Sequence, residues 1–125
     1  MGKENLNIFW ETVPALKCNF RCLNCYAAEN ARPDTRLLDW GEMKIALEKV
    51  VALGAKKIDI LGGEPLTYRH LEKFIEHFKN NVVDGFCGVV SNGSLATKKR
   101  ARSLLDSGID QLSISLDGTN AEIND

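Results

Sequence analysis

The sequence predicts an α/β fold made of parallel βα repeats. Two patterns indicate this fold. Four short segments rich in β-branched and aromatic residues alternate with three longer segments whose apolar residues recur at the spacing of one helix face. No linker, internal repeat or low-complexity tract divides the 125 residues. We therefore expect a single domain over residues 1–125, with the element order βαβαβαβ.

The first strand and helix are predicted from composition and from capping residues. Residues 6–13 (LNIFWETV) have the composition of a strand and end before Pro14, which cannot donate a hydrogen bond to a sheet. A helix is expected to begin at Asp39, which forms a capping-box pattern with Glu42, and to end at Gly54. The apolar stripe of this helix consists of Met43, Ala46, Leu47 and Val50.

The second βα unit is predicted from a short apolar run and a second helical stripe. Residues 56–63 (KKIDILGG) predict a strand that runs into a glycine turn. Residues from about 67 to 80 are expected to form the second helix, because apolar residues recur there at i, i+3, i+4 and i+7. These apolar residues are Leu71, Phe74, Ile75 and Phe78.

The third strand is expected at residues 85–93 (GFCGVVSNG) and the fourth at 111–118 (QLSISLDG). Between them, Thr97 can cap a third helix that ends near Gly108. Strands joined through helices in this order lie parallel, with right-handed crossovers that pack the helices against the sheet.

In parallel sheets of this kind, ligands bind beyond the carboxyl ends of the strands. A polar or glycine-rich segment follows each of the four predicted strands. These segments are CNFRCLNCY (18–26), GGEP (62–65), SNG (91–93) and SLDG (115–118). We therefore expect the functional site at this edge of the sheet.

Composition narrows the classes of partner. The chain carries 16 basic and 17 acidic residues, and the resulting net charge of -1 gives no electrostatic reason to expect binding to nucleic acid or to an anionic membrane. The first ten residues are too polar for a signal peptide, and no apolar run is long enough to span a membrane. We expect a cytoplasmic protein, in which clustered cysteines act as metal ligands or redox groups more often than as disulfides.

Three of the four cysteines lie within eight residues, at Cys18, Cys22 and Cys25. A structural zinc site needs four ligands, and Cys87 lies in an apolar segment (FCGVV) where a small buried residue is expected. Three thiolates in one loop suit an iron–sulfur cube that keeps one iron without a protein ligand. Structural zinc, a reactive thiol and a disulfide remain the alternatives.

The other polar segments each have a structural and a functional interpretation. In GGEP, two glycines and a proline make a turn, but the same bare backbone lets a ligand approach, and Glu64 offers a carboxylate to an ammonium group. Asn92 is typical of a turn, and Ser115 and Asp117 can satisfy backbone donors where a strand ends. Their shared edge favours the functional interpretation.

Taken together, the motifs resemble those of the radical S-adenosylmethionine (SAM) superfamily. The resemblance covers nearly the whole chain and is strongest from Trp10 to Gly118. Within the superfamily, CNFRCLNCY and GGEPL look most like the branch of SPASM-type maturases, sulfatase-activating enzymes and their relatives in cofactor biosynthesis. The motifs that carry the resemblance to the superfamily are Cys18-x3-Cys22-x2-Cys25, GGE at 62–64, SNG at 91–93 and SLDG at 115–118.

The resemblance implies two cofactors and their ligands. Cys18, Cys22 and Cys25 would bind a [4Fe-4S] cluster, and SAM would chelate the fourth iron through its amino and carboxylate groups. Ser115 matches a position that contacts the ribose or carboxylate of SAM. The residues expected to line the methionine end of SAM are Gly62, Gly63 and Glu64, and those expected nearby are Asn92 and Asp117. Asn24 departs from the aromatic residue or histidine that is common before the third cysteine.

The resemblance also implies a reaction. An electron from a flavodoxin- or ferredoxin-like donor would split SAM reductively into methionine and a 5′-deoxyadenosyl radical, which abstracts hydrogen from the substrate. The expected substrate is a peptide or protein, or a cofactor precursor. The alternative is a noncatalytic metal-binding fragment that acts through a partner chain.

The resemblance to this family also implies a barrel with more strands than this chain contains. A (βα)6 barrel of the TIM type has six repeats, and this chain has residues for the first four strands. We therefore expect a single radical SAM core domain that is truncated after its fourth strand. It is either the N-terminal part of a longer enzyme or a partial barrel that a second chain completes.

Overall fold

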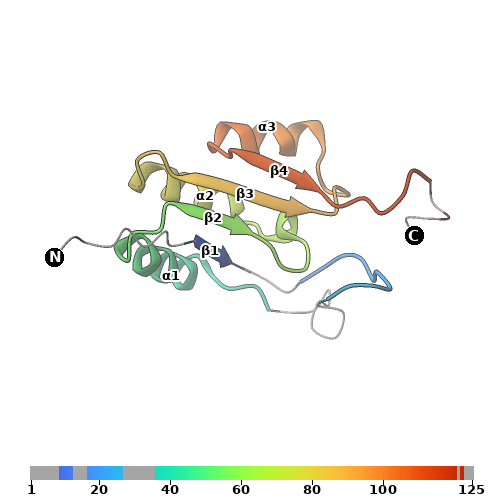
Figure 1. Ribbon diagram of the computed structural model, residues 1–125, viewed down its shortest axis with the longest axis horizontal. Helices are drawn as coiled ribbons and strands as arrows, with labels where there is room; N and C mark the ends of the chain where they lie inside the picture. The colour runs from blue at the N-terminus through green and yellow to red at the C-terminus, as the bar shows by residue number, and fades with distance from the viewer. Residues whose placement is uncertain (1–8, 13–16, 27–35, 121, 123–125) are drawn as a thin grey trace.

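The computed structural model describes residues 9–12, 17–26, 36–120 and 122. In this part of the chain, four strands form one sheet and three α-helices and a short 3₁₀ helix connect them (Figure 1). The elements are β1 (Phe9–Thr12), α1 (Trp40–Ala52), β2 (Lys57–Ile60), η1 (Pro65–Thr67), α2 (Leu71–Asn81), β3 (Phe86–Ser91), α3 (Lys98–Asp106) and β4 (Gln111–Ile114).

All neighbouring strands are parallel, and the sheet has the order β1-β2-β3-β4. The predicted α/β class, the order of the elements and the parallel pairing are therefore confirmed. Figure 1 shows the four arrowheads pointing the same way, so the carboxyl ends of the strands meet at one edge of the sheet. The expected residues 6–8 and 13 of the first strand lie outside the described residues.

The first helix begins where its capping residues predict. The Glu42 backbone N–H donates to the Asp39 side chain (2.9 Å), and the Asp39 backbone N–H donates to the Glu42 side chain (3.0 Å). This reciprocal capping box satisfies two backbone donors that the first turn of a helix would leave unpaired. Gly54 then adopts a positive φ of 97°, which favours glycine, just after the C-terminus.

The second helix begins later than the predicted residue 67. Residues Pro65–Thr67 form the single 3₁₀ turn η1, because the side chain of Glu64 accepts the Leu66 backbone N–H and holds the chain in that turn. Tyr68 then has an extended backbone (φ -79°, ψ 111°), which interrupts the helix before α2 begins at Leu71. The four predicted apolar residues of α2 are nonetheless all buried.

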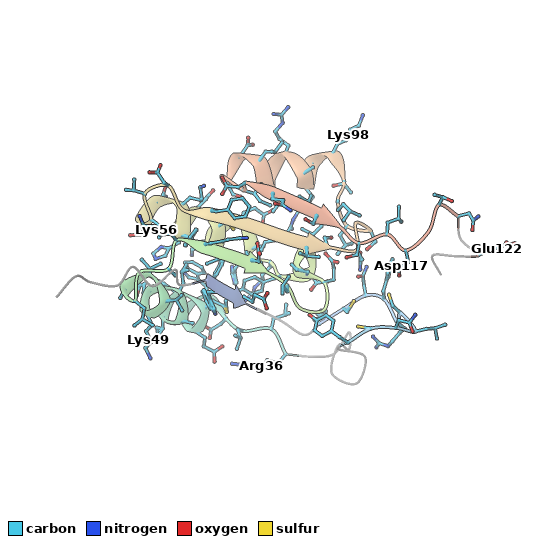
Figure 2. All side chains as sticks on the ribbon, viewed as in Figure 1. Arg36, Lys49, Lys56, Lys98, Asp117 and Glu122 are labelled. Carbon is cyan, nitrogen blue, oxygen red and sulfur yellow. The ribbon has the colours of Figure 1, made fainter. Side chains whose placement is uncertain are left out.

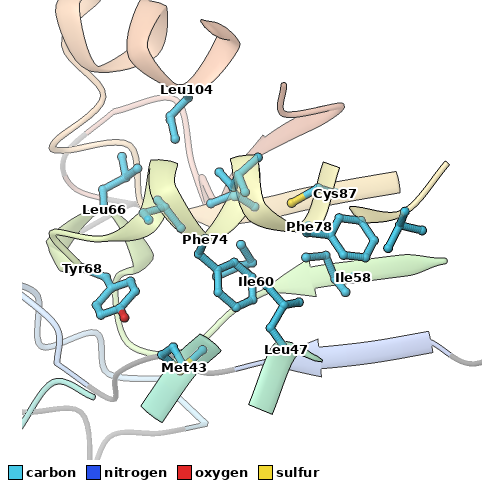
Figure 3. Close-up of a cluster of buried hydrophobic side chains, with 14 residues drawn as sticks. Met43, Leu47, Ile58, Ile60, Leu66, Tyr68, Phe74, Phe78, Cys87 and Leu104 are labelled. Atoms are coloured by element: carbon cyan, nitrogen blue, oxygen red, sulfur yellow. The ribbon is translucent and has the colours of Figure 1, made fainter. Parts of the chain in front are cut away.

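One hydrophobic core joins the helices to a single face of the sheet (Figure 3). Side chains of all three α-helices and of the two central strands belong to it, so α1, α2 and α3 all pack against the same face. Members labelled in Figure 3 include Met43, Leu47, Phe74, Phe78 and Leu104 from the helices, and Ile58, Ile60 and Cys87 from the strands. Burial of these side chains is the main force that holds the elements together.

The opposite face of the sheet is more polar. Lys57 and Asp59 of β2 form an ion pair on it (3.8 Å), and the Lys57 ammonium lies 5.2 Å from the centre of the Phe86 ring. The Asp59 carboxylate lies over Gly88 of β3, in space that a Cβ atom at position 88 would occupy. Among the described residues, no helix is both long enough and apolar enough to cross a lipid bilayer.

Candidate functional site

The segments that follow the strands gather at the carboxyl edge, as the sequence predicts. The cysteine segment (residues 17–26) lies beyond the tips of the strand arrows in Figure 1, next to the turn that follows β2. Asp117 lies toward the same end of the molecule, whereas the Lys49 and Lys98 side chains extend away from its body (Figure 2). Hydrogen bonds show how these segments are joined.

The three clustered cysteines are free thiols in different environments. Cys18 is buried (9% exposed), Cys25 is half-buried and Cys22 is exposed. The Phe20 backbone N–H lies 3.4 Å from the Cys18 sulfur and donates to it, and the Cys25 N–H donates to the Cys22 carbonyl oxygen (3.3 Å). In the part of the chain that the structure describes, no three histidine, cysteine, aspartate or glutamate side chains lie close enough together to hold a metal ion. The three thiols thus share a loop but do not form a preassembled metal site.

The fourth cysteine lies elsewhere. Cys87 is fully buried (0% exposed) in the core face of β3, as its apolar neighbours predict. Burial, together with the nearby charge of Asp110, raises the pKa of the Cys87 thiol to about 12. Cys87 is therefore a neutral packing residue in this fold and not part of the loop that carries the other thiols.

Glu64 lies at the carboxyl edge of the sheet, but its side chain is buried and not exposed to solvent. Its side chain is 0% exposed, and its carboxylate accepts three hydrogen bonds. Oε1 accepts from the Leu66 backbone N–H (3.0 Å) and from the Ser91 hydroxyl (2.7 Å). Oε2 accepts from the Asn92 backbone N–H (2.7 Å). The carboxylate thus connects the turn after β2 to the SNG segment after β3. The contact between Glu64 and an ammonium group stays a prediction.

Two hydrogen bonds fasten the cysteine segment to the glycine turn. The Glu64 backbone N–H donates to the carbonyl oxygen of Lys17, the residue before the first cysteine (2.8 Å). The Tyr26 hydroxyl donates to the Gly62 carbonyl oxygen (3.1 Å). Gly62 has a φ of 128°, a conformation that favours glycine, so the turn that meets the cysteine segment requires glycine at this position.

Side chains also fasten the cysteine segment to the SNG segment. The Asn92 amide nitrogen donates to the Asn19 side-chain oxygen (3.0 Å), and the Asn19 amide nitrogen donates to the Ser94 hydroxyl (2.9 Å). The Ser94 backbone N–H in turn donates to the Asn92 side-chain oxygen (2.9 Å). The predicted site residue Asn92 is thus brought beside the cysteine segment.

Sequence reasoning did not single out Asn19 or Ser91. Asn19 follows the first cysteine directly, and Ser91 is the first residue of SNG, so their places in the motifs are the signals that could have found them. Ser115 is joined to the same edge through its backbone, because its N–H donates to the Ser91 carbonyl oxygen (2.9 Å). The side chains of Ser115 and Asp117 are exposed just beyond β4.

The sequence matches the model of one protein family, the radical SAM superfamily, over residues 12–125. The chain belongs to this superfamily. Membership confirms the predicted family, and the cofactors that define radical SAM proteins are the expected [4Fe-4S] cluster and SAM. It leaves the roles of individual residues as predictions.

Curated relatives include the GTP 3′,8-cyclases of two staphylococci. The chain is 37% identical to that of Staphylococcus epidermidis over an alignment 109 residues long, which covers 81% of this chain and 31% of the relative. It is 38% identical to that of Staphylococcus haemolyticus over an alignment 116 residues long, which covers 86% of this chain and 33% of the relative. The chain therefore spans about a third of the length of these relatives.

Solved structures share the fold. The crystal structure of BtrN in complex with AdoMet and 2-DOIA matches with a TM-score of 0.75 and 24% identity, over 87% of this chain and 45% of BtrN. An open conformation of BtrN matches with a TM-score of 0.73 and 22% identity, over 95% of this chain and 54% of BtrN. These matches confirm the predicted partial barrel of the TIM type, with four parallel strands.

The donor set of the cysteine segment fits the cluster that radical SAM proteins carry. Three unpaired thiols lie on one loop, and one of them, Cys22, is exposed. Thiolates are the usual ligands of iron–sulfur clusters. The remaining thiol, Cys87, is held in the core, so the loop offers three sulfur ligands rather than the four of a closed thiolate site.

Proposed function

We propose that this chain is the cofactor-binding part of a radical SAM enzyme, with residues 1–125 forming one core domain. Cys18, Cys22 and Cys25 hold the [4Fe-4S] cluster. The same loop and the segments after β2, β3 and β4 would hold SAM. The residues assigned to the SAM site are Gly62, Gly63, Glu64, Asn92, Ser115 and Asp117. The observation that carries this assignment is the hydrogen bond from the Glu64 N–H to the Lys17 carbonyl oxygen (2.8 Å), which fixes the cysteine segment against the glycine turn.

When bound, the two cofactors supply reductive cleavage of SAM to methionine and a 5′-deoxyadenosyl radical, which takes a hydrogen atom from the substrate. The electron comes from an external one-electron donor of the flavodoxin or ferredoxin type. The residues of this chain bind and orient the cofactors. The exposed cysteine segment gives a donor access, and the bare backbone of Gly62 and Gly63 lets a ligand approach closely.

The names of the relatives support one class of substrate. Their name, GTP 3′,8-cyclase, is that of an enzyme acting on a nucleotide. This favours a cofactor precursor over a peptide or protein as the substrate of this chain. We further propose that the protein works in the cytoplasm, and that strands beyond β4, from the same polypeptide or from a second chain, complete the barrel at the β4 edge.

Anaerobic reconstitution tests the proposal. The chain is loaded with iron and sulfide, reduced, and examined by electron paramagnetic resonance (EPR) with and without SAM, and 5′-deoxyadenosine is measured. We expect about four iron and four sulfide per chain, an EPR signal that changes on adding SAM, and formation of 5′-deoxyadenosine. Zinc in place of iron, or a signal indifferent to SAM, would contradict the proposal.

Two cysteine variants provide a matched comparison. Cys22→Ala removes an exposed thiol of the loop and should abolish the cluster, whereas Cys87→Ala removes a buried thiol of β3 and should leave iron content unchanged. A cluster that survives in Cys22→Ala would reject the assignment of that ligand. A loaded protein that binds SAM without producing 5′-deoxyadenosine would instead support the noncatalytic alternative.

A further inference from the structure

Every polar group of Glu64 already has a hydrogen-bond partner within the protein. Its carboxylate accepts three hydrogen bonds, its N–H donates to Lys17, and its carbonyl oxygen accepts from the Thr67 N–H (3.0 Å) and hydroxyl (2.7 Å). The side chain is 0% exposed. A carboxylate that is removed from solvent is stable only when such donors surround it. The arrangement is therefore that of a group that holds other segments in place.

The Ser91 hydroxyl extends this network by one residue. It donates to Glu64 Oε1 (2.7 Å) and accepts the backbone N–H of Gly93 (3.0 Å). Gly93 has a φ of 79°, so the hydroxyl stabilises the turn of the SNG segment at its glycine. Glu64 and Ser91 thus act as a unit that connects the turns after β2 and β3.

We propose that the Glu64 carboxylate, with the Ser91 hydroxyl, is a positioning group that sets the spacing between the cysteine segment, the glycine turn and the SNG segment. It does this without contacting the SAM ammonium. That the segments hold SAM and the cluster rests on the proposed function. That Glu64 and Ser91 hold the segments in place rests on the hydrogen bonds alone. Within the proposed SAM site, Glu64 thus acts indirectly, through the segments that it holds.

Both oxygens of this side chain are needed as acceptors by the donors around it. Three donors, from Leu66, Ser91 and Asn92, point at two oxygens. In Glu64→Gln, one oxygen becomes an NH₂ group, which has no lone pair to offer. At least one buried donor then loses its acceptor, whichever way the amide is turned. Glu76→Gln, at an exposed glutamate of α2, is the matched control.

Amide hydrogen exchange on the cofactor-free protein is the first test. We expect Glu64→Gln to accelerate exchange about tenfold at the Leu66 and Asn92 amides and in residues 17–26, because losing a buried hydrogen bond favours local opening. Glu76→Gln should exchange as the wild type does. Unchanged exchange at both Leu66 and Asn92 would overturn the proposal, and this result does not depend on any cofactor.

Titration of the reconstituted protein with SAM, followed by EPR, is the second test. For Glu64→Gln we expect wild-type iron content but about tenfold weaker binding of SAM, together with the faster exchange. Weaker binding with unchanged exchange would mean that the carboxylate contacts SAM directly, and would also overturn the proposal. A wild-type protein that takes up no cluster would reject the proposed function, while the exchange result still decides this inference.

Ser91→Ala is the second variant, in case Glu64→Gln does not fold. It removes one donor to Glu64 and leaves the Leu66 and Asn92 bonds intact. We expect faster exchange at Gly93, whose N–H loses its acceptor, and a smaller loss of SAM affinity than in Glu64→Gln. Wild-type exchange at Gly93 in this variant would count against the Glu64–Ser91 unit.

Discussion

Tyr26 and Gly62 are joined by a hydrogen bond from the tyrosine hydroxyl to the glycine carbonyl oxygen, with 3.1 Å between the two oxygens. Because Tyr26 is 80% exposed, its ring adds little packing. Tyr26→Phe should therefore leave global stability within about 0.5 kcal/mol of wild type while loosening the cysteine segment. Amide exchange should rise in residues 17–26 and stay unchanged in β3. Unaltered exchange in the segment would show that this bond does not hold it.

The four thiols should differ sharply in reactivity. Cys22 is exposed, whereas Cys87 is fully buried and burial raises its pKa to about 12. Because the thiolate is the reactive form, iodoacetamide at mildly alkaline pH should alkylate Cys22 quickly and leave Cys87 unmodified until the protein is unfolded in denaturant. Peptide mass spectrometry measures both sites in one sample. Equal labelling of Cys22 and Cys87 under native conditions would contradict the packing of β3.

Helix α1 contributes to stability through one face only. Leu47 is 0% exposed in the core, and Ile45, two residues earlier, is 57% exposed. Leu47→Ala should cost about 2–5 kcal/mol in the free energy of unfolding, because it removes buried methyl groups and leaves a cavity. Ile45→Ala in the same helix should cost less than about 1 kcal/mol. Urea unfolding of both variants is the measurement, and similar losses would argue against the described packing of α1.

Gly88 and Asp59 compete for the same space. A Cβ atom at position 88 would overlap the Asp59 carboxylate and approach the Phe86 ring to 3.4 Å. Gly88→Ala should therefore destabilise the protein by about 1–3 kcal/mol. The double variant Gly88→Ala/Asp59→Ala should recover part of that loss, since the overlapping carboxylate is gone. Strictly additive losses in thermal unfolding would disprove the coupling.

Asp110 should make stability depend on pH in the acid range. Burial acts to raise its pKa, but hydrogen bonds from the Lys79 ammonium and the Cys87 backbone N–H (each 2.7 Å) outweigh burial and lower it. A group whose pKa is lower in the folded than in the unfolded protein stabilises the fold above its unfolded pKa, about 3.9. That contribution disappears as the pH falls through the lower folded value.

Asp110→Asn tests this dependence. The variant should lose about 1 kcal/mol at neutral pH, a modest amount because the ion pair with Lys79 is partly exposed. Its stability should then fall less steeply than that of the wild type below about pH 4. Urea midpoints recorded across the acid range give the comparison, and parallel curves for the two proteins would exclude Asp110 as the titrating group.

Much of the fold could be predicted because local signals and the global arrangement agree. Asp39 and Glu42 carry the capping box in their spacing alone, and four strand patterns separated by helical patterns leave parallel pairing as the natural topology. The start of α2 could not be predicted in the same way. It is displaced to Leu71 by the side-chain cap that Glu64 provides for η1 and by the extended backbone of Tyr68.

The sequence predicted which residues belong to the candidate site better than it predicted the contacts between them. The motifs place Cys22, Gly62 and Asn92 at one edge, because all three follow parallel strands. The bond between Asn19 and Asn92 joins residues far apart in the sequence, and the burial of Glu64 depends on donors from another βα unit. Sequence spacing also leaves open how closely thiols on one loop approach each other, which is why the lack of a preassembled three-ligand metal site among the described residues could not be foreseen.

The sheet has one further consequence, for how the chain acquires its structure. Each strand pairs with the strand that precedes it in the sequence, so the order β1-β2-β3-β4 is also the order of synthesis. Every new βα unit that leaves the ribosome meets a partner that has already been made. Such stepwise growth means that no strand has to await a partner strand that is synthesised later. During translation, we expect the cysteine segment to lack its hydrogen-bond partners until Glu64 and then Asn92 have left the ribosome.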